Sequence, residues 1–192
     1  MKKILRGSDY EKIEDEASDL IEDLGLRQFP VNCFEVAFLL GIGIQKYSDF
    51  NDADMGFIKS KTEDGFTILK GRKYIIYYND AVDRKRIKFT IWHEIAHIQL
   101  GHLEEGRNLS YERQEEEANH FAAYVMAPLV FIHKMGLSDP IEISDECEIS
   151  FEFASYVYEH YVKAFQYAGV RDAILNSRIA KLLTYSPKEA SA

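Results

Sequence analysis

The chain has 192 residues, of which 46% are hydrophobic and 13% aromatic, so it can bury a core in one compact unit or in a domain with an appendage. Its formal net charge of -9 at pH 7 repels phosphate backbones and anionic lipid, so we expect neither nucleic acid nor a membrane as a partner. The two cysteines, Cys33 and Cys147, lie far apart, which argues against a disulfide framework and a cysteine zinc site. With no apolar run long enough to span a bilayer, the sequence predicts a soluble, cytoplasmic protein.

Two amphipathic helices are predicted near the start of the chain. In 8–24, Ser8 and Glu11 have the spacing of a capping box, and six apolar residues fall on one helical stripe. The stripe consists of Tyr10, Ile13, Ala17, Leu20, Ile21 and Leu24. In 30–41, Asn32 is the candidate N-cap, and a glycine ends the helical pattern.

The next part of the chain favours β structure. Residues 43–48 have an extended pattern. Within 55–80, two short runs are separated by a turn at 63–65, and a strand rich in Tyr and Ile follows at 74–78. These runs predict a small sheet.

The remainder of the chain is predicted to be helical. The pattern is helical from 80 to 101 and again from 110 to 128, where Pro128 ends it, and two or three more helices follow. We therefore expect an α+β fold with one domain at 1–128 and a helical C-terminal region at 129–192.

A possible metal site is signalled by the pentapeptide His-Glu-Ile-Ala-His at residues 93–97. On a helix, positions i and i+4 share a face, so the imidazoles of His93 and His97 can reach one ion while Glu94 sits beside the vacant coordination position. A chain of this composition contains such a motif by chance in roughly two of a hundred cases. The alternative is a pair of ordinary, hydrogen-bonded helix histidines.

A tetrahedral catalytic zinc needs a third protein ligand. One known spacing would place a third histidine at residue 103, but Leu103 stands there and His102 misses the position by one. The other known solution takes a glutamate from a following helix. The run 115–117 consists of three glutamates, and the small Ala118 after it lets two helices approach closely.

At these residues the chain resembles the ImmA/IrrE family of zinc metallopeptidases. The resemblance is carried by the segments "YIIYYND", "HEIAHIQLGH" and "EEEANHFAAYVMAP", and it extends back through "PVNCFEVAFLLGIGIQKY" to cover most of 10–128. It implies a zincin-like fold of the gluzincin type. In that fold a small, mainly antiparallel sheet packs on the HExxH helix and the glutamate helix, and a helical segment follows.

The resemblance also implies the roles of the site residues. Placing the family's E-x-x-A-N pattern on this chain makes Glu115 the third ligand of one zinc ion, beside His93 and His97. Glu94 is then the general base of peptide hydrolysis. Glu117 stays open as an alternative third ligand.

Other polar residues of the glutamate helix have two possible roles each on sequence grounds. Asn119, one turn after the third ligand, either orients a ligand histidine or faces solvent. His120, Tyr111 and Tyr124 are candidates for stabilising an oxyanion, but residues of these types on such a helix more often serve packing.

The strand before the metal helix has two readings. If it lies at the edge of the sheet, it can pair with an extended substrate peptide and place the scissile bond over the metal. Otherwise it is an ordinary core strand. The residues concerned are Tyr74, Ile75, Ile76, Tyr77 and Tyr78.

The leading functional hypothesis is a cytoplasmic zinc endopeptidase. By resemblance, its substrate is a helix-turn-helix transcriptional repressor of a mobile element, a phage or a stress response. The alternative is a DNA-binding or stress-response regulator with a vestigial metal site. The region after residue 128 resembles the helix-turn-helix-like segment of relatives, but Glu152 and Glu159 on its candidate recognition helix disfavour contact with phosphates.

Overall fold

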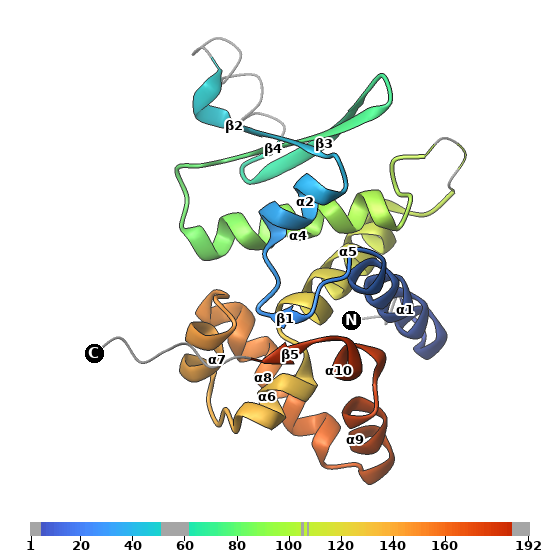
Figure 1. Cartoon of the computed structure of the whole chain (residues 1–192), viewed down its shortest axis with the longest axis vertical. Helices are drawn as coiled ribbons and strands as arrows, with labels where there is room; N and C mark the ends of the chain where they lie inside the picture. Colours follow the sequence, from blue (N-terminus) through green and yellow to red (C-terminus); the bar gives the residue numbers. More distant parts are fainter. Residues whose placement is uncertain (1–4, 51–61, 105, 107, 186–192) are drawn as a thin grey trace. The chain divides into compact units, whose positions relative to one another are not determined.

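The computed structural model describes residues 5–50, 62–104, 106 and 108–185 (Figure 1). These residues form an α+β fold in which most of the structure is helical and the sheets are small. The predicted fold class is confirmed.

Contacts within the chain divide it into two compact units. Unit 1 comprises residues 1–13 and 32–122, and unit 2 comprises residues 14–31 and 123–192. The segment 14–31 thus belongs with the C-terminal part of the chain. The predicted domain boundary at residue 128 stays a prediction.

Helix α1 (Gly7–Asp23) begins with a different cap from the one predicted. The carboxylate of Asp9 accepts a hydrogen bond from the backbone N–H of Arg6 at 2.8 Å. This bond satisfies an N–H that the helix leaves unpaired, so the helix starts at Gly7. The predicted box of Ser8 and Glu11 would have required a later start.

Helix α2 (Cys33–Leu39) has the predicted cap. The side-chain oxygen of Asn32 accepts from the backbone N–H of Phe34 at 3.0 Å. The chain leaves the helix through Gly41, whose φ of 68° is a left-handed conformation that glycine adopts without strain. Strand β2 (Gly43–Lys46) and a short 3-10 helix (Tyr47–Asp49) follow.

The described residues of unit 1 contain a three-stranded sheet in the order β2-β4-β3. Strand β4 (Lys73–Tyr78) is central: it pairs in parallel with β2 and antiparallel with β3 (Gly65–Lys70). The sheet is therefore mixed, and only one of its two pairings is antiparallel. The first predicted run of the 55–80 region lies largely outside the described residues.

Helix α4 (Arg84–Gln99) packs against β3, β4 and α2 (Figure 1). Asp83 caps it by accepting from the backbone N–H of Lys85 at 2.7 Å. Its apolar face, which includes Ile91, Trp92 and Ile95, is completely or almost completely buried. Each such side chain contributes roughly 1.5–3 kcal/mol on burial, so the face holds the helix firmly against its neighbours.

Helix α5 (Tyr111–Met126) completes the helical part of unit 1 up to Ala122. Ala118, Phe121 and Ala122 on this helix are fully buried. Among the described residues, no single helix is long and apolar enough to cross a membrane. Two consecutive segments, 111–135 and 140–146, have that length and composition together, but with a sharp bend at the break.

The part of unit 2 that the structure describes consists of helices and one short strand pair. Strands β1 (Gln28–Phe29) and β5 (Thr184–Tyr185) pair in parallel, and the ring of Phe29 stacks on that of Phe131 with centroids 4.9 Å apart. Its helices are α6 (Leu129–Met135), α7 (Pro140–Glu146), α8 (Phe151–Phe165), α9 (Ala168–Leu175) and α10 (Arg178–Leu182). The sequence predicted two or three helices here, because several of these are too short to show an apolar stripe.

Candidate metal centre

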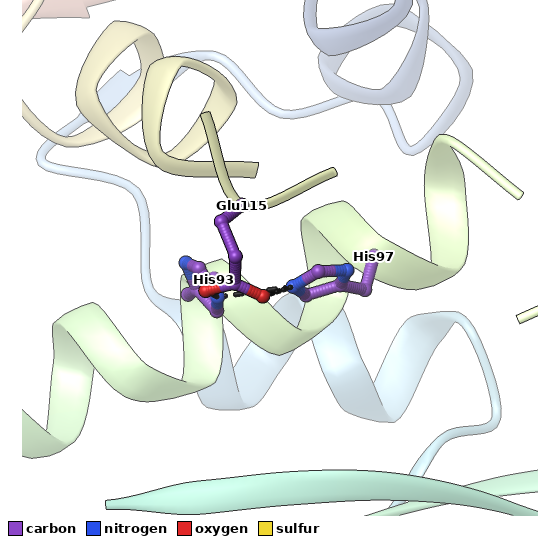
Figure 2. Close-up of side chains that lie close together, drawn as sticks. All are labelled: His93, His97 and Glu115. Atoms are coloured by element: carbon purple, nitrogen blue, oxygen red, sulfur yellow. Dashed lines mark hydrogen bonds and ion pairs between the residues drawn. The ribbon is translucent and has the colours of Figure 1, made fainter. Parts of the chain in front are cut away.

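Helix α4 places two imidazoles side by side. His93 and His97 are one turn apart, and their Nε2 atoms lie 3.0 Å from each other (Figure 2). The same helix spacing that motivated the prediction produces this arrangement, since residues i and i+4 share a helix face.

Glu115 on α5 reaches the same point from the facing helix (Figure 2). One carboxylate oxygen lies 3.4 Å from Nε2 of His93, and the other lies 3.3 Å from Nε2 of His97. Among the described residues, this is the one group of three His, Cys, Asp or Glu side chains whose ligand atoms all lie within 4.8 Å of one another.

The three donors fit a zinc ion. Zinc binds imidazole nitrogen and carboxylate oxygen at about 2.0–2.2 Å in tetrahedral geometry, which separates two ligand atoms by about 3.3 Å. The three observed separations of 3.0, 3.3 and 3.4 Å are close to this value. Two nitrogens and one oxygen also leave a fourth position, as in catalytic zinc sites.

The electrostatics of the cluster keep His97 and Glu115 in the protonation states that bind a metal, whereas His93 has to give up a proton. Burial, and next the charge of His93, lower the pKa of His97 to about 4, so its imidazole is neutral at pH 7 and keeps a lone pair for a metal. The hydrogen bond with His93 lowers the pKa of Glu115, which stays ionised. Burial lowers the pKa of His93, but the hydrogen bond with Glu115 and the charge of Glu94 outweigh burial and leave that pKa above its ordinary value.

Glu94 lies beside this cluster and is nearly buried, with 8% of its surface exposed. Burial raises the pKa of its carboxyl, and the charge of Glu115 adds to the increase. The hydroxyl of Thr67 on β3 donates to one carboxylate oxygen at 2.7 Å. Thr67 has no distinguishing signal in the sequence, because its contact with Glu94 exists only once β3 packs on α4.

Asn119 contacts His93 on the side of the ring away from the cluster, as the interpretation that it orients a ligand histidine requires. Its side-chain oxygen is 3.0 Å from Nδ1 of His93. An amide oxygen can only accept, so Nδ1 carries a proton, and once Nε2 loses the proton that it shares with Glu115, its lone pair points to the cluster.

His97 has a corresponding partner that the sequence analysis did not assign. Nδ1 of His102 lies 2.9 Å from Nδ1 of His97, and Nε2 of His102 lies 2.9 Å from a carboxylate oxygen of Glu117. Glu117, the alternative third ligand, is therefore engaged by His102 and lies outside the group of three donors. The glycine-histidine pair that ends "HEIAHIQLGH" was the available signal.

The three oxyanion candidates are in different surroundings. Of the three, Tyr111 interacts electrostatically with the cluster: the charge of Glu115, and next burial, raise the pKa of its phenol. The ring of His120 lies against that of Tyr10 with centroids 4.6 Å apart. Tyr124 is in unit 2 and lies within hydrogen-bond distance of a serine hydroxyl there.

Residues 74–78 form a central strand of the sheet, which is the second of the two interpretations that the sequence allowed. Both sides of β4 are paired, one with β2 and one with β3, so its backbone groups are not open to a peptide. Ile76, Tyr77 and Tyr78 are buried. Of the two predicted interpretations, the one in which residues 74–78 offer an edge to substrate is therefore wrong, because β2 and β3 already occupy both sides of the strand.

Comparison with known families identifies a peptidase family. A family model for the IrrE N-terminal-like domain, a peptidase family, matches residues 49–159, which is more than half of the chain. The matched part includes β3, β4, α4 and α5, and with them the three donors and Glu94. No curated protein matches the chain.

Proposed function

Since the chain belongs to the ImmA/IrrE family, we propose that it is a zinc-dependent endopeptidase that cuts a helix-turn-helix transcriptional repressor. Membership of a peptidase family implies peptidase activity and therefore a protein substrate. The observation that carries the proposal is the triangle of donors from His93, His97 and Glu115, with sides of 3.0 to 3.4 Å, beside the buried carboxylate of Glu94.

In this proposal each chain holds one zinc ion. His93 and His97 bind it through Nε2, and Glu115 binds it through a carboxylate oxygen. When bound, the ion supplies Lewis-acid polarisation of the scissile carbonyl and of the attacking water. Asn119 keeps the lone pair of His93 directed at the ion.

Glu94 acts as the general base. Because the pKa of Glu94 is raised, it lies closer to the working pH, at which a base must both take and return a proton. Thr67 fixes one carboxylate oxygen, and the other takes a proton from the attacking water. As the water oxygen bonds to the carbonyl carbon and the C–N bond breaks, Glu94 passes that proton to the leaving amine.

Strand β3 is our candidate for binding the substrate main chain. Among the described residues it pairs along one side only, with β4, so its other side offers N–H and C=O groups to an extended peptide. Thr67 lies on this strand and touches Glu94, so a peptide added to β3 lies beside the base. This surface takes over the role that the sequence analysis gave to residues 74–78.

The repressor as substrate follows from the family resemblance. Main-chain pairing carries little sequence information, so the choice of one protein target has to come from contacts outside the cleft. A peptidase that removes a repressor acts as an anti-repressor, and we place its action in the cytoplasm, where it would switch a mobile element, a phage or a stress response.

The experiment is cleavage of a helix-turn-helix repressor encoded beside this chain's gene. Zinc-loaded protein and repressor are incubated together, and the products are mapped by intact-protein mass spectrometry. We expect one or very few cuts, and none in the presence of a zinc chelator.

Glu94→Gln is the matched control, because it keeps the shape and removes the base. It should fold and bind zinc while the cleavage rate falls by about 10²–10⁴-fold. Cleavage at the normal rate by this variant would refute the role of Glu94. If the variant also retains full biological activity, the regulator with a vestigial site is the better hypothesis.

A further inference from the structure

A continuous chain of hydrogen bonds leads away from His97 on the side opposite the cluster. Nδ1 of His97 is 2.9 Å from Nδ1 of His102, whose Nε2 is 2.9 Å from Glu117. Nε of Arg113 donates to the other oxygen of Glu117 at 2.8 Å, and a terminal nitrogen of Arg113 donates to Asp9 at 3.1 Å. All five residues belong to unit 1.

The chemistry of the two ends of this chain of hydrogen bonds determines which atom donates and which accepts in each bond. Arg113 can only donate, so Glu117 is the acceptor, and the second oxygen of Glu117 accepts from Nε2–H of His102. A neutral His102 that donates through Nε2 must accept through Nδ1. The proton between the two rings therefore belongs to Nδ1 of His97, and this leaves Nε2 of His97 with the lone pair that faces the cluster.

The members of the network are buried deeply enough for the arrangement to be specific. The side chain of His102 has no exposed surface, and that of Glu117 is 7% exposed. A buried carboxylate or imidazole that lost its partner would be left without water to replace it, so both are held to these hydrogen bonds. Glu112, on the same helix as Glu117, is exposed.

We propose that His102, Glu117 and Arg113 are positioning residues that hold His97 in its metal-binding tautomer and thereby set the affinity for zinc. The inference rests on the metal site of the proposed function and adds what controls that site. Partners of this kind orient ligand histidines in other metal sites, and their loss typically weakens metal binding by about 10–100-fold.

The test measures zinc affinity by competition with a chromophoric chelator at constant pH. His102→Phe keeps an aromatic ring, of somewhat larger volume, and removes both hydrogen bonds. Glu117→Gln replaces one of the two acceptor oxygens by an NH₂ group, which cannot accept from Arg113 or His102. Each should weaken zinc binding by about 10–100-fold. His102→Gln offers one acceptor and one donor and should recover part of the loss, while the control Glu112→Gln should bind zinc as the wild type does.

A second measurement separates positioning from general support of the fold. Nitrogen-15 NMR of the metal-free protein reports which ring nitrogen of His97 carries the proton. The wild type should carry it on Nδ1, and His102→Phe should shift the population toward Nε2. Should His102→Phe fail to fold, the near-isosteric Glu117→Gln gives the same two readouts.

Wild-type zinc affinity in folded His102→Phe or Glu117→Gln, or an unchanged tautomer of His97, would overturn the inference. This failure can be told apart from failure of the proposed function. Cleavage of the repressor with normal dependence on Glu94 would then still support the peptidase. Predicted losses of zinc affinity without any cleavage would support the network and reject the peptidase.

Discussion

The two units of the chain bury polar side chains of different kinds. In the described part of unit 1, one Ser or Thr hydroxyl, that of Thr90, is buried and bonds to the backbone, but four buried His and Glu side chains are bonded to other side chains: Glu94, His97, His102 and Glu117. In unit 2, the polar side chains found buried among the described residues are Ser18 and Ser144. Each of these hydroxyls donates to a backbone carbonyl oxygen.

The contrast distinguishes buried polar groups that serve a functional site from buried polar groups that serve the fold. A hydroxyl that bonds to the backbone closes a local turn at little cost, whereas a buried ionisable group is expensive unless every partner is in place. Unit 1 carries four such groups on α4, on α5 and in the turn after α4; hydrogen bonds connect His102 and Glu117 to His97, and Glu94 lies beside the cluster. We therefore expect changes in unit 1 to alter metal binding and catalysis, and changes in unit 2 to alter stability or target choice.

Loss of a proposed metal ligand should have the largest effect on zinc binding. His93→Ala, His97→Ala and Glu115→Ala should each weaken zinc binding by more than the 10–100-fold expected for an outer partner, because a ligand atom is lost outright. Zinc content after dialysis and chelator competition measure the effect. Glu116→Ala on the same helix is the control and should bind normally. Retention of zinc by Glu115→Ala together with its loss from Glu117→Ala would show that the third ligand is misassigned.

A side chain at Gly65 should disturb the contact between β3 and α4. Its Cβ would lie 2.5 Å from Cγ2 of Thr90 and 2.8 Å from the carbonyl oxygen of Tyr77, so the strand would have to move. Gly65→Ala should cost about 1–3 kcal/mol of stability and slow peptide hydrolysis, since the hydroxyl that holds Glu94 moves with the strand.

Gly169→Ala is the matched change in unit 2. A Cβ at Gly169 meets nothing within 4 Å, so this variant should keep wild-type stability or gain slightly, and keep full activity. Thermal unfolding and hydrolysis of a model peptide measure both variants. Equal activity of the two variants would break the assignment of β3 to the site.

Exposed aromatics of α8 should affect target choice more than chemistry. Phe151 and Tyr156 are each about half exposed, with values of 53% and 54%. If this face docks the repressor, replacing both by Ser should slow repressor cleavage by about tenfold and leave peptide cleavage unchanged. Equal slowing on both substrates would mean that α8 supports the catalytic fold.

Point changes are the cleaner test of this region. Removing 129–192 would also strip partners from the segment 14–31 of the same unit, including the stacking of Phe131 on Phe29.

The smallest effect is expected for a buried hydroxyl of unit 2. Ser144→Ala removes the hydrogen bond to the carbonyl oxygen of Ile149 at 2.7 Å and should lower the free energy of unfolding by about 1 kcal/mol. Denaturant unfolding measures this change. Zinc affinity should be unchanged, and a loss of affinity in the folded variant would contradict the separation between the units.

The sequence predicted much of what depends on local spacing, although the box predicted at Ser8 and Glu11 is not the cap of α1. The cap at Asn32 and the shared face of His93 and His97 follow from positions two to four residues apart, and the helix at 84–99 follows from a local helical pattern. The α+β class follows from the alternation of helical and extended patterns, and the peptidase family follows from motifs that local spacing preserves.

Features that depend on tertiary neighbours were missed or left open. Whether residues 74–78 form an edge or a central strand depends on β2 and β3, and one sequence does not give the order of strands. The contact of Thr67 with Glu94 and that of His102 with Glu117 join residues on different elements. Glu115 and Glu117 are alike in sequence and differ only in what faces them.

The most direct test of the central claim is a crystal structure of the zinc-loaded protein with anomalous data collected at the zinc absorption edge. We expect one zinc peak per chain, at about 2.0–2.2 Å from Nε2 of His93, Nε2 of His97 and a carboxylate oxygen of Glu115. A peak bound instead by Glu117 or His102, or no ordered zinc at this cluster, would contradict the account.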